Sequence, residues 1–210
     1  MSEIQQAVSA IRAGEPVIIP TDTVYGLACT PYDEVPMRKL APLKDRSPDQ
    51  PIALLAASVD WLLECVPELR GRAGVIARAL LPGPYTLVVP NPACRYPWLT
   101  GRRPDTIGVR VPELAGPGRH VLDLVGAVAA TSANRHGEPD PRRLDDVPDE
   151  ILTAVAAVVD GGELPGTPST VLDLTGAEPR VLREGAASAA EAVARVEALL
   201  YDPPRWPSRR

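Results

Sequence analysis

The chain has 210 residues, 45% hydrophobic and 23% charged, which predicts one soluble globular domain with a buried core. Its formal net charge of −5 argues against a surface that binds nucleic acid non-specifically, although it leaves room for a local basic cavity. Three scattered cysteines without a C-x-x-C pair indicate reduced thiols, and the sequence shows no signal peptide and no apolar run of about 18 residues. We therefore expect a cytoplasmic protein without a membrane partner.

The first third of the chain alternates predicted helices and buried strands. Ser2 and Gln5 have the spacing of a capping box, which predicts a helix over residues 2–13 that stops at Gly14. Apolar runs between prolines and glycines then predict a strand at 17–19, a helix or turn that begins at 25–27, a helix at 35–43 and a strand at 51–56.

The remaining segments continue this alternation. They predict one helix that begins after Ser58 and further helices at 74–81, 121–125 and 151–157. They also predict strands at 85–90, 106–112, 127–130 and 158–160. Residues 169–174 and 179–183 have the pattern of a hairpin turned around Gly176, and Ser188 with Glu191 predicts the start of a C-terminal helix. Residues 136–148 are polar and rich in proline, which is typical of a surface loop.

Interleaved strands and helices with a predicted hairpin indicate a mixed α/β, or α+β, fold rather than a purely parallel sheet. No internal repeat and no long linker divides the chain. We expect a single domain over residues 1–202 and a frayed tail over 203–210.

Anion-binding side chains are the main candidates for a site. The chain has no Walker loop, no G-x-G-x-x-G after a strand, and no metal-ligand spacing around its two histidines. Ser132 and His136 lack the G-x-S-x-G elbow and the orienting acid of a serine hydrolase. A bound nucleotide must then be held by cations and polar donors near the ends of predicted strands: Lys44, Arg46, Arg110, Arg183, Thr23, Thr106, Ser132 and Asn134. Taken singly, each also fits a cap, a turn or a surface charge.

Six segments that follow one another over about residues 15–187 carry a resemblance to a known family. They are PTDTVYGLACTP at 20–31, LKDRSPDQPIAL at 43–54, LPGPYTLVVP at 81–90, TIGVRVP at 106–112, TSANRHGEPDP at 131–141, and DGGELPGTPSTVLDL at 160–174 through VLREGA at 181–186. In this combination they resemble the YrdC/TsaC family of threonylcarbamoyl-AMP synthases. The resemblance implies a YrdC/RibB-like fold, with a twisted mixed sheet, helices packed around it and a positively charged concave cavity at its centre.

The resemblance also assigns roles to the candidate residues. The Lys-x-Arg and Ser-x-Asn pairs that mark the family's site fall on Lys44 and Arg46 and on Ser132 and Asn134, which implies that these four are catalytic. Two residues match positions that hold L-threonine, namely Thr23 and Arg110. Four match positions that contact ATP, namely Arg46, Thr106, Ser132 and Arg183. No protein metal ligands are implied.

The family's reaction is adenylyl transfer, which makes the implied enzyme a nucleotidyltransferase. L-threonine, bicarbonate and ATP give threonylcarbamoyl-AMP and pyrophosphate, with Mg²⁺ on the phosphates. The product passes to the tRNA threonylcarbamoyl transferase machinery for adenosine 37 of tRNAs that read ANN codons. The carbamate is already an anionic nucleophile, so positioning and charge neutralisation matter more than a strong general base, and the scarcity of histidine is no obstacle.

The sequence departs from the family pattern at two positions. Asp45 stands where a glycine often separates the lysine and the arginine, so its carboxylate must point away from the anion site. Leu55 stands where some relatives carry a histidine that touches threonine, which implies fewer contacts to threonine here. The chain also ends soon after the synthase region, without the second domain of longer relatives.

Two other functions compete with the synthase. The same fold has been associated with double-stranded RNA through its basic cavity, so a weak RNA-binding module is one alternative. The acidic net charge and the small number of aromatic residues make it less favoured. The other is a carbamoyl-transfer domain of the hydrogenase-maturation kind, which normally sits in a much longer chain with zinc-finger-like cysteines.

Overall fold

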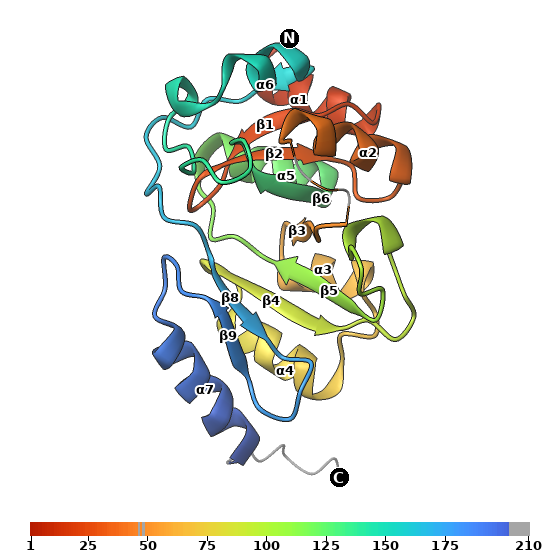
Figure 1. Cartoon of the computed structure of the whole chain (residues 1–210), viewed down its shortest axis with the longest axis vertical. Coiled ribbons are helices and arrows are strands. Elements are labelled where there is room, and N and C mark those ends of the chain that lie inside the picture. Colours follow the sequence, from red (N-terminus) through yellow and green to blue (C-terminus); the bar gives the residue numbers. More distant parts are fainter. Residues whose placement is uncertain (46, 48, 202–210) are drawn as a thin grey trace.

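The structure, a computed structural model, describes residues 1–45, 47 and 49–201, and for residues 200 and 201 it describes the backbone alone. Over these residues the chain forms a nine-stranded mixed sheet in the order β7-β1-β2-β6-β3-β5-β4-β8-β9, with helices packed around it (Figure 1). This arrangement confirms the mixed α/β fold. The predicted tail over 203–210 lies outside the described residues.

The strands are short. Their bounds are β1 (Val17–Pro20), β2 (Tyr25–Cys29), β3 (Ala53–Ala56), β4 (Tyr85–Pro90), β5 (Thr106–Arg110), β6 (Ala127–Ser132), β7 (Ala157–Val158), β8 (Thr170–Asp173) and β9 (Arg180–Arg183). The pairs β1–β7, β3–β5 and β4–β8 are parallel, and the other neighbouring pairs are antiparallel. The predicted hairpin near the C-terminus is the antiparallel pair β8–β9.

The helices lie at or near the predicted segments. Their bounds are α1 (Glu3–Arg12), α2 (Glu34–Leu43), α3 (Val59–Cys65), α4 (Gly71–Leu80), α5 (Gly116–Val125), α6 (Asp149–Ala154) and α7 (Ala189–Tyr201), with short 3-10 turns at Pro97–Leu99 and Leu144–Asp146. The capping box of Ser2 and Gln5 is formed, and the Ser58 hydroxyl accepts from the Trp61 N–H, as predicted. Helix α5 begins five residues earlier than predicted, because Pro117 occupies its first turn, where no N–H is needed.

One element was predicted wrongly. Residues 25–27 were expected to begin a helix or turn, but they open strand β2, which pairs antiparallel with β1. The tight turn lies just before them, where the Thr21 hydroxyl donates to the Val24 carbonyl at 2.7 Å. Tyr25 is fully buried, so the apolar packing of its ring, which sequence spacing did not reveal, favours the strand.

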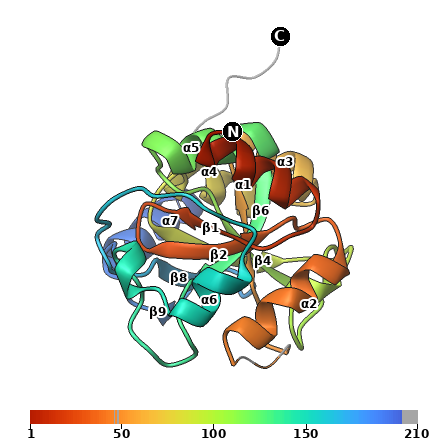
Figure 2. The same cartoon turned by 90° about the horizontal axis from the view of Figure 1, so that it is seen from above.

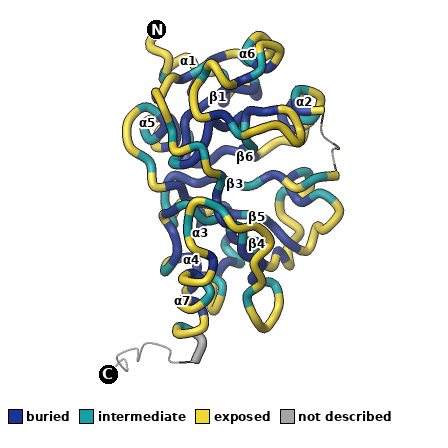
Figure 3. The backbone as a smooth tube through the Cα atoms, turned by 60° about the vertical axis from the view of Figure 1, so that its left-hand side comes forward, coloured by how far each residue is buried: buried dark blue, intermediate teal, exposed yellow. Residues whose placement is uncertain are grey.

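Successive side chains along the strands point to opposite faces of the sheet and pack into two separate cores. Ile18, Leu27 and Leu54 pack in the larger core with α2, α3, α4, α6 and α7. Val17, Ala28 and Leu55 point the other way, into a smaller core with α1 and α5. Figure 2 shows α1 and α5 on one side of β1 and β2, with α2 and α6 on the other, and Figure 3 shows the buried strands between exposed outer surfaces.

The face that carries the smaller core also carries a cavity. Leu55 and Ala130 belong to that core and line the cavity as well, so helices α1 and α5 cover only one end of this face. Where the cavity lies, the strands carry small side chains such as Gly26 and Ala53. Small side chains leave the concave face of the sheet open to a ligand.

No helix in the described part of the chain combines the length and apolar character needed to cross a lipid bilayer.

We predict that Leu54→Ala lowers the free energy of unfolding by about 2–5 kcal/mol, because Leu54 is fully buried in β3 between two neighbouring strands. Urea denaturation measures this change. Leu182→Ala is the matched control, since Leu182 is 56% exposed on the edge strand β9, and it should change stability by less than about 0.5 kcal/mol. Equal effects of the two substitutions would contradict the assigned core.

Candidate active site

The cavity lies on the concave face of the sheet and has a volume of about 200 Å³. We call it the Arg110 cavity. Strands β2, β3, β4, β5, β6 and β8 each contribute to its lining, together with the turn after β1. Five of its lining residues, Pro51, Thr131, Ser132, Asp140 and Arg183, also line a neighbouring cavity of about 470 Å³, which we call the Lys44 cavity. The two cavities therefore form one continuous cleft.

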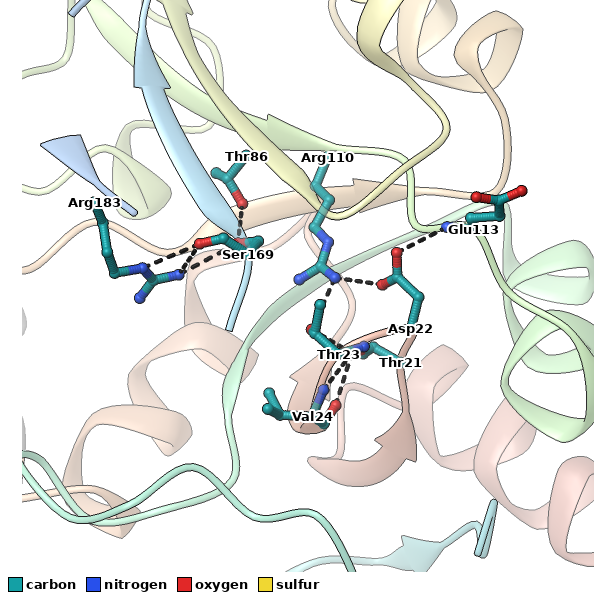
Figure 4. A network of polar contacts seen from close by, with 9 residues as sticks. All are labelled: Thr21, Asp22, Thr23, Val24, Thr86, Arg110, Glu113, Ser169 and Arg183. Carbon is teal, nitrogen blue, oxygen red and sulfur yellow. Dashed lines mark hydrogen bonds and ion pairs between the residues drawn. The ribbon is translucent and has the colours of Figure 1, made fainter. Parts of the chain in front are cut away.

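Arg110 is held at one end of the cleft by the turn between β1 and β2 (Figure 4). Its Nη2 donates to Thr23 Oγ1 at 2.9 Å and forms a close ion pair with Asp22 Oδ1. The other oxygen of Asp22 accepts from the backbone N–H of Glu113 at 3.0 Å. Thr21 and Thr23 share a hydroxyl–hydroxyl bond of 3.1 Å. The turn thus fixes both polar partners of one guanidinium nitrogen.

The Arg110 guanidinium is nearly enclosed by protein, with its side chain 8% exposed. Burial lowers the pKa of Arg110, the carboxylate of Asp22 counteracts that shift, and the positive charge of Arg183 adds to it. Among the described residues, the buried Nε of Arg110 is a side-chain nitrogen without a hydrogen-bond partner. A buried unpaired donor costs about 1–3 kcal/mol.

A second arginine enters the cleft from the edge strand β9. Arg183 donates from Nε and Nη2 to the Ser169 carbonyl, at 3.1 and 2.8 Å. The Ser169 hydroxyl in turn lies 2.8 Å from the hydroxyl of Thr86 on β4. Arg183 therefore brings a second positive charge to the cleft, and it lines both cavities.

Lys44 brings the third cation, at the C-terminus of α2. Its ammonium donates to Asn134 Oδ1 at 2.9 Å and closely contacts the Ser132 carbonyl. Ser132 Oγ donates to the same Asn134 oxygen at 2.6 Å, and the backbone carbonyl of Lys44 accepts from the His136 N–H. Lys44 of the Lys-x-Arg motif thus contacts the Ser-x-Asn motif, whose Ser132 lies 88 residues further along the chain.

The register shows that the site does not gather at a single carboxyl edge of the sheet. Leu55 pairs with Arg110 on one side and with Val128 on the other, so Arg110 lies level with Val128. Ser132 is four residues further along β6, which is roughly 13 Å at 3.3 Å per residue. The backbones of Arg110 and Ser132 are therefore separated along the strand direction, whereas the side chain of Arg110 reaches Thr23 in the turn before β2, whose Gly26 pairs with Ser132.

Three predicted site residues remain, Thr23, Thr106 and Arg46, and beside them Asp45. Thr23 is fully buried against Arg110, while Thr106, 7% exposed, donates to the Arg103 carbonyl and does not line either cavity. Arg46 lies outside the described residues. Asp45 is exposed, and its backbone has a φ of +49°, a left-handed conformation that glycine adopts freely.

Sequence reasoning gave no role to several polar residues in or beside this cleft, among them Asp22, Thr86, Asp140 and Ser169. Asp22 lies in the segment PTDTVYGLACTP, where only Thr23 was given a role, and Ser169 and Thr86 were read only as parts of strands. The signal available for Asp22 was its position between two threonines after a buried strand. Ser169 and Thr86 are 83 residues apart, and only the parallel pairing of β4 with β8 brings them together.

Three comparisons place the chain among known proteins. The Sua5, YciO and YrdC family model, described as telomere recombination, matches residues 9–185. The threonylcarbamoyl-AMP synthase of Pyrococcus abyssi is 35% identical over 87% of this chain and 54% of its own length. That of Pseudomonas syringae is 34% identical over 87% of this chain and 97% of its own length. The crystal structure of P. abyssi Sua5 complexed with L-threonine matches with a TM-score of 0.80 at 29% identity, over 100% of this chain and 63% of that one.

The chain thus spans about half the length of the Pyrococcus relative and nearly all of the Pseudomonas one.

The left-handed backbone of Asp45 makes a prediction about stability. Asp45→Gly should keep or raise the free energy of unfolding, by up to about 1 kcal/mol, whereas Asp45→Val should lower it by about 1–2 kcal/mol. Thermal and urea denaturation measure both. Asp49→Gly is the control, because Asp49 is exposed in the same loop without a positive φ, and glycine there should be destabilising. A less stable Asp45→Gly variant would contradict the assigned conformation.

Proposed function

The chain belongs to the Sua5/YciO/YrdC family, and we propose from this premise that it is a threonylcarbamoyl-AMP synthase. It joins L-threonine, bicarbonate and ATP, and it releases pyrophosphate, which makes it a nucleotidyltransferase. The observation that carries the proposal is the buried Arg110, which lines a cavity continuous with a second cationic cluster around Lys44. One cleft thereby offers separate binding subsites for an amino-acid carboxylate and for a polyphosphate.

The chemistry that this cleft must support is a displacement at phosphorus. Threonine's amine and bicarbonate form a carbamate with loss of water, and a carbamate oxygen attacks the α-phosphorus of ATP. The bond from that phosphorus to the bridging oxygen of the β-phosphate breaks, and pyrophosphate leaves with the electron pair. Both reactants are anions, so bringing them together requires fixed positive charge more than a strong base.

We assign the carboxylate of threonine to the Arg110 end of the cleft. Asp22 and Thr23 occupy Nη2, so a ligand carboxylate can be paired with the remaining N–H groups of the guanidinium. Leu55 pairs with Arg110 across the strands and lines the same cavity, so it gives this subsite an apolar wall. Thr23 accepts a hydrogen bond from Arg110 and helps hold the arginine towards the substrate.

We assign the phosphates of ATP to Lys44, Arg183 and the Ser132–Asn134 pair. Lys44 and Arg183 line the Lys44 cavity from opposite parts of the chain, and Ser132 lines both cavities. Arg46 is proposed here from the sequence motif alone, because it lies outside the described residues. Thr106 is proposed as an ATP contact from the resemblance alone, because its hydroxyl donates to the Arg103 carbonyl.

The donor set of the cleft fits a Mg²⁺ ion that arrives with ATP. In the described part of the chain, no three His, Cys, Asp or Glu side chains group together as a metal site. Mg²⁺ at nucleotide sites is commonly bound by substrate phosphates with one or two carboxylates. Asp140 lines both cavities and would supply such a carboxylate. The ion would neutralise charge on the departing pyrophosphate.

The product of this reaction is a reactive mixed anhydride that must be consumed by a transferase. We propose that it passes to the tRNA threonylcarbamoyl transferase machinery for modification of tRNA adenosine, as the resemblance implies. Direct double-stranded RNA binding is not favoured by any described feature of the cleft, whose cations are buried or bonded to neighbouring polar groups.

Pyrophosphate release tests the proposed function directly. We predict release from ATP that depends on L-threonine and on bicarbonate, each varied while the other is held fixed. Serine and valine at equal concentration are the matched amino-acid controls and should support less turnover. Pyrophosphate release that continues unchanged without threonine would contradict the synthase assignment. Release without bicarbonate would show that no carbamate takes part in the reaction.

Arg183→Gln tests the phosphate subsite. We expect the KM for ATP to rise about 10- to 100-fold, because a charge-assisted contact to phosphate is lost, and the melting temperature to stay nearly unchanged, since Arg183 is exposed. Arg180→Gln, on the same strand, is the control: Arg180 pairs with the buried Asp173, so its loss should lower stability without changing the KM for ATP. The reverse pattern would contradict the assignment of Arg183.

A further inference from the structure

We propose that Asp22 is a positioning residue that fixes the guanidinium of Arg110 and thereby gives the cleft its preference for a substrate carboxylate. The inference rests on the proposed function, in which Arg110 holds the carboxylate of threonine. Asp22 itself need not touch the substrate, because it acts through Arg110.

The first step of the argument is that both oxygens of Asp22 are fixed. Oδ1 forms a close ion pair with Nη2 of Arg110, and Oδ2 accepts from the Glu113 N–H at 3.0 Å (Figure 4). A carboxylate is a double acceptor, so it satisfies two donors that face it from different elements. The backbone at Glu113 is thus linked to the guanidinium through one rigid group.

The second step is that little else sets the orientation of Arg110. The side chains of Asp22 and Arg110 are 9% and 8% exposed, so water does not compete strongly for the pair. Thr23 accepts from the same Nη2, which leaves Nε unpaired in the buried guanidinium. Asp22 and Thr23 therefore hold one nitrogen and leave the other N–H groups to a ligand.

The third step concerns the neutral isostere. An asparagine at position 22 can accept from Arg110 or from the Glu113 N–H, but its NH₂ group then faces the other donor. One of the two contacts must be lost, and the buried arginine loses the charge that compensates its own. The guanidinium is then free to turn away from the substrate carboxylate.

The experiment compares binding of L-threonine and of L-threoninamide, whose carboxylate is replaced by a neutral amide, by calorimetry without ATP. The wild-type protein should bind threonine more tightly, and Asp22→Asn should reduce this preference at least 10-fold. In turnover, Asp22→Asn should lower kcat/KM for threonine by about 100-fold, as expected for a misplaced substrate contact, and leave the KM for ATP within about twofold.

Asp173→Asn is the matched control. Asp173 is also a buried aspartate paired with an arginine, and both of its oxygens accept, from Thr175 and from Arg180. It does not line either cavity. We expect this variant to lose stability while its preference for threonine over threoninamide stays at the wild-type value. A general consequence of removing the charge of a buried aspartate would instead change both variants alike.

Asp22→Glu keeps the negative charge and is the second variant if Asp22→Asn does not fold. Its carboxylate is displaced by one methylene, so the preference for threonine should again fall. An unchanged preference in either folded variant overturns the proposal. Failure of the proposed function is a separate result, since it would appear in the wild-type protein as pyrophosphate release that ignores threonine.

Discussion

The cleft depends on a positive charge held where little water reaches it. Arg110 lies on a sheet face made largely of small and apolar side chains, and such a charge is tolerated only with a partner and hydrogen bonds. Asp22 supplies the partner, and the turn between β1 and β2 supplies the geometry through Thr23. The pair engages Nη2 and leaves Nε unpaired, and Arg110 lines the cavity in this fixed position.

The sheet explains how two anionic substrates can share this cleft. Helices α1 and α5 cover one end of the concave face, and the rest of that face stays open as two joined cavities. The backbones of Arg110 and Ser132 are separated along the strand direction, and the Arg110 side chain extends to the turn before β2. Ser132 lines both cavities, so it marks the place where the two substrates meet in the proposed reaction.

Local patterns predicted most of the elements, because capping boxes, prolines and apolar runs act over a few residues. The Lys44–Asn134 contact could be anticipated only from the motif resemblance, since nothing local links residues 90 positions apart. Asp22 and Ser169 were missed for the same reason: their partners come from strands distant in the sequence. Strand β2 was mispredicted because Gly26 suggests a turn, whereas burial of Tyr25 decides for a strand. Asp45 shows the converse, since the glycine that the family resemblance led us to expect at its position would favour the left-handed backbone found here.

The central claim is that this cleft joins the carbamate of threonine to the α-phosphate of ATP. Mass spectrometry of a reaction containing ATP, L-threonine and ¹³C-labelled bicarbonate tests it most directly. We predict a threonylcarbamoyl-adenylate that carries one ¹³C atom and forms in equal amount with pyrophosphate. Formation of pyrophosphate with an adenylate that carries no ¹³C would contradict the account, because the carbamate would then have no part in the displacement.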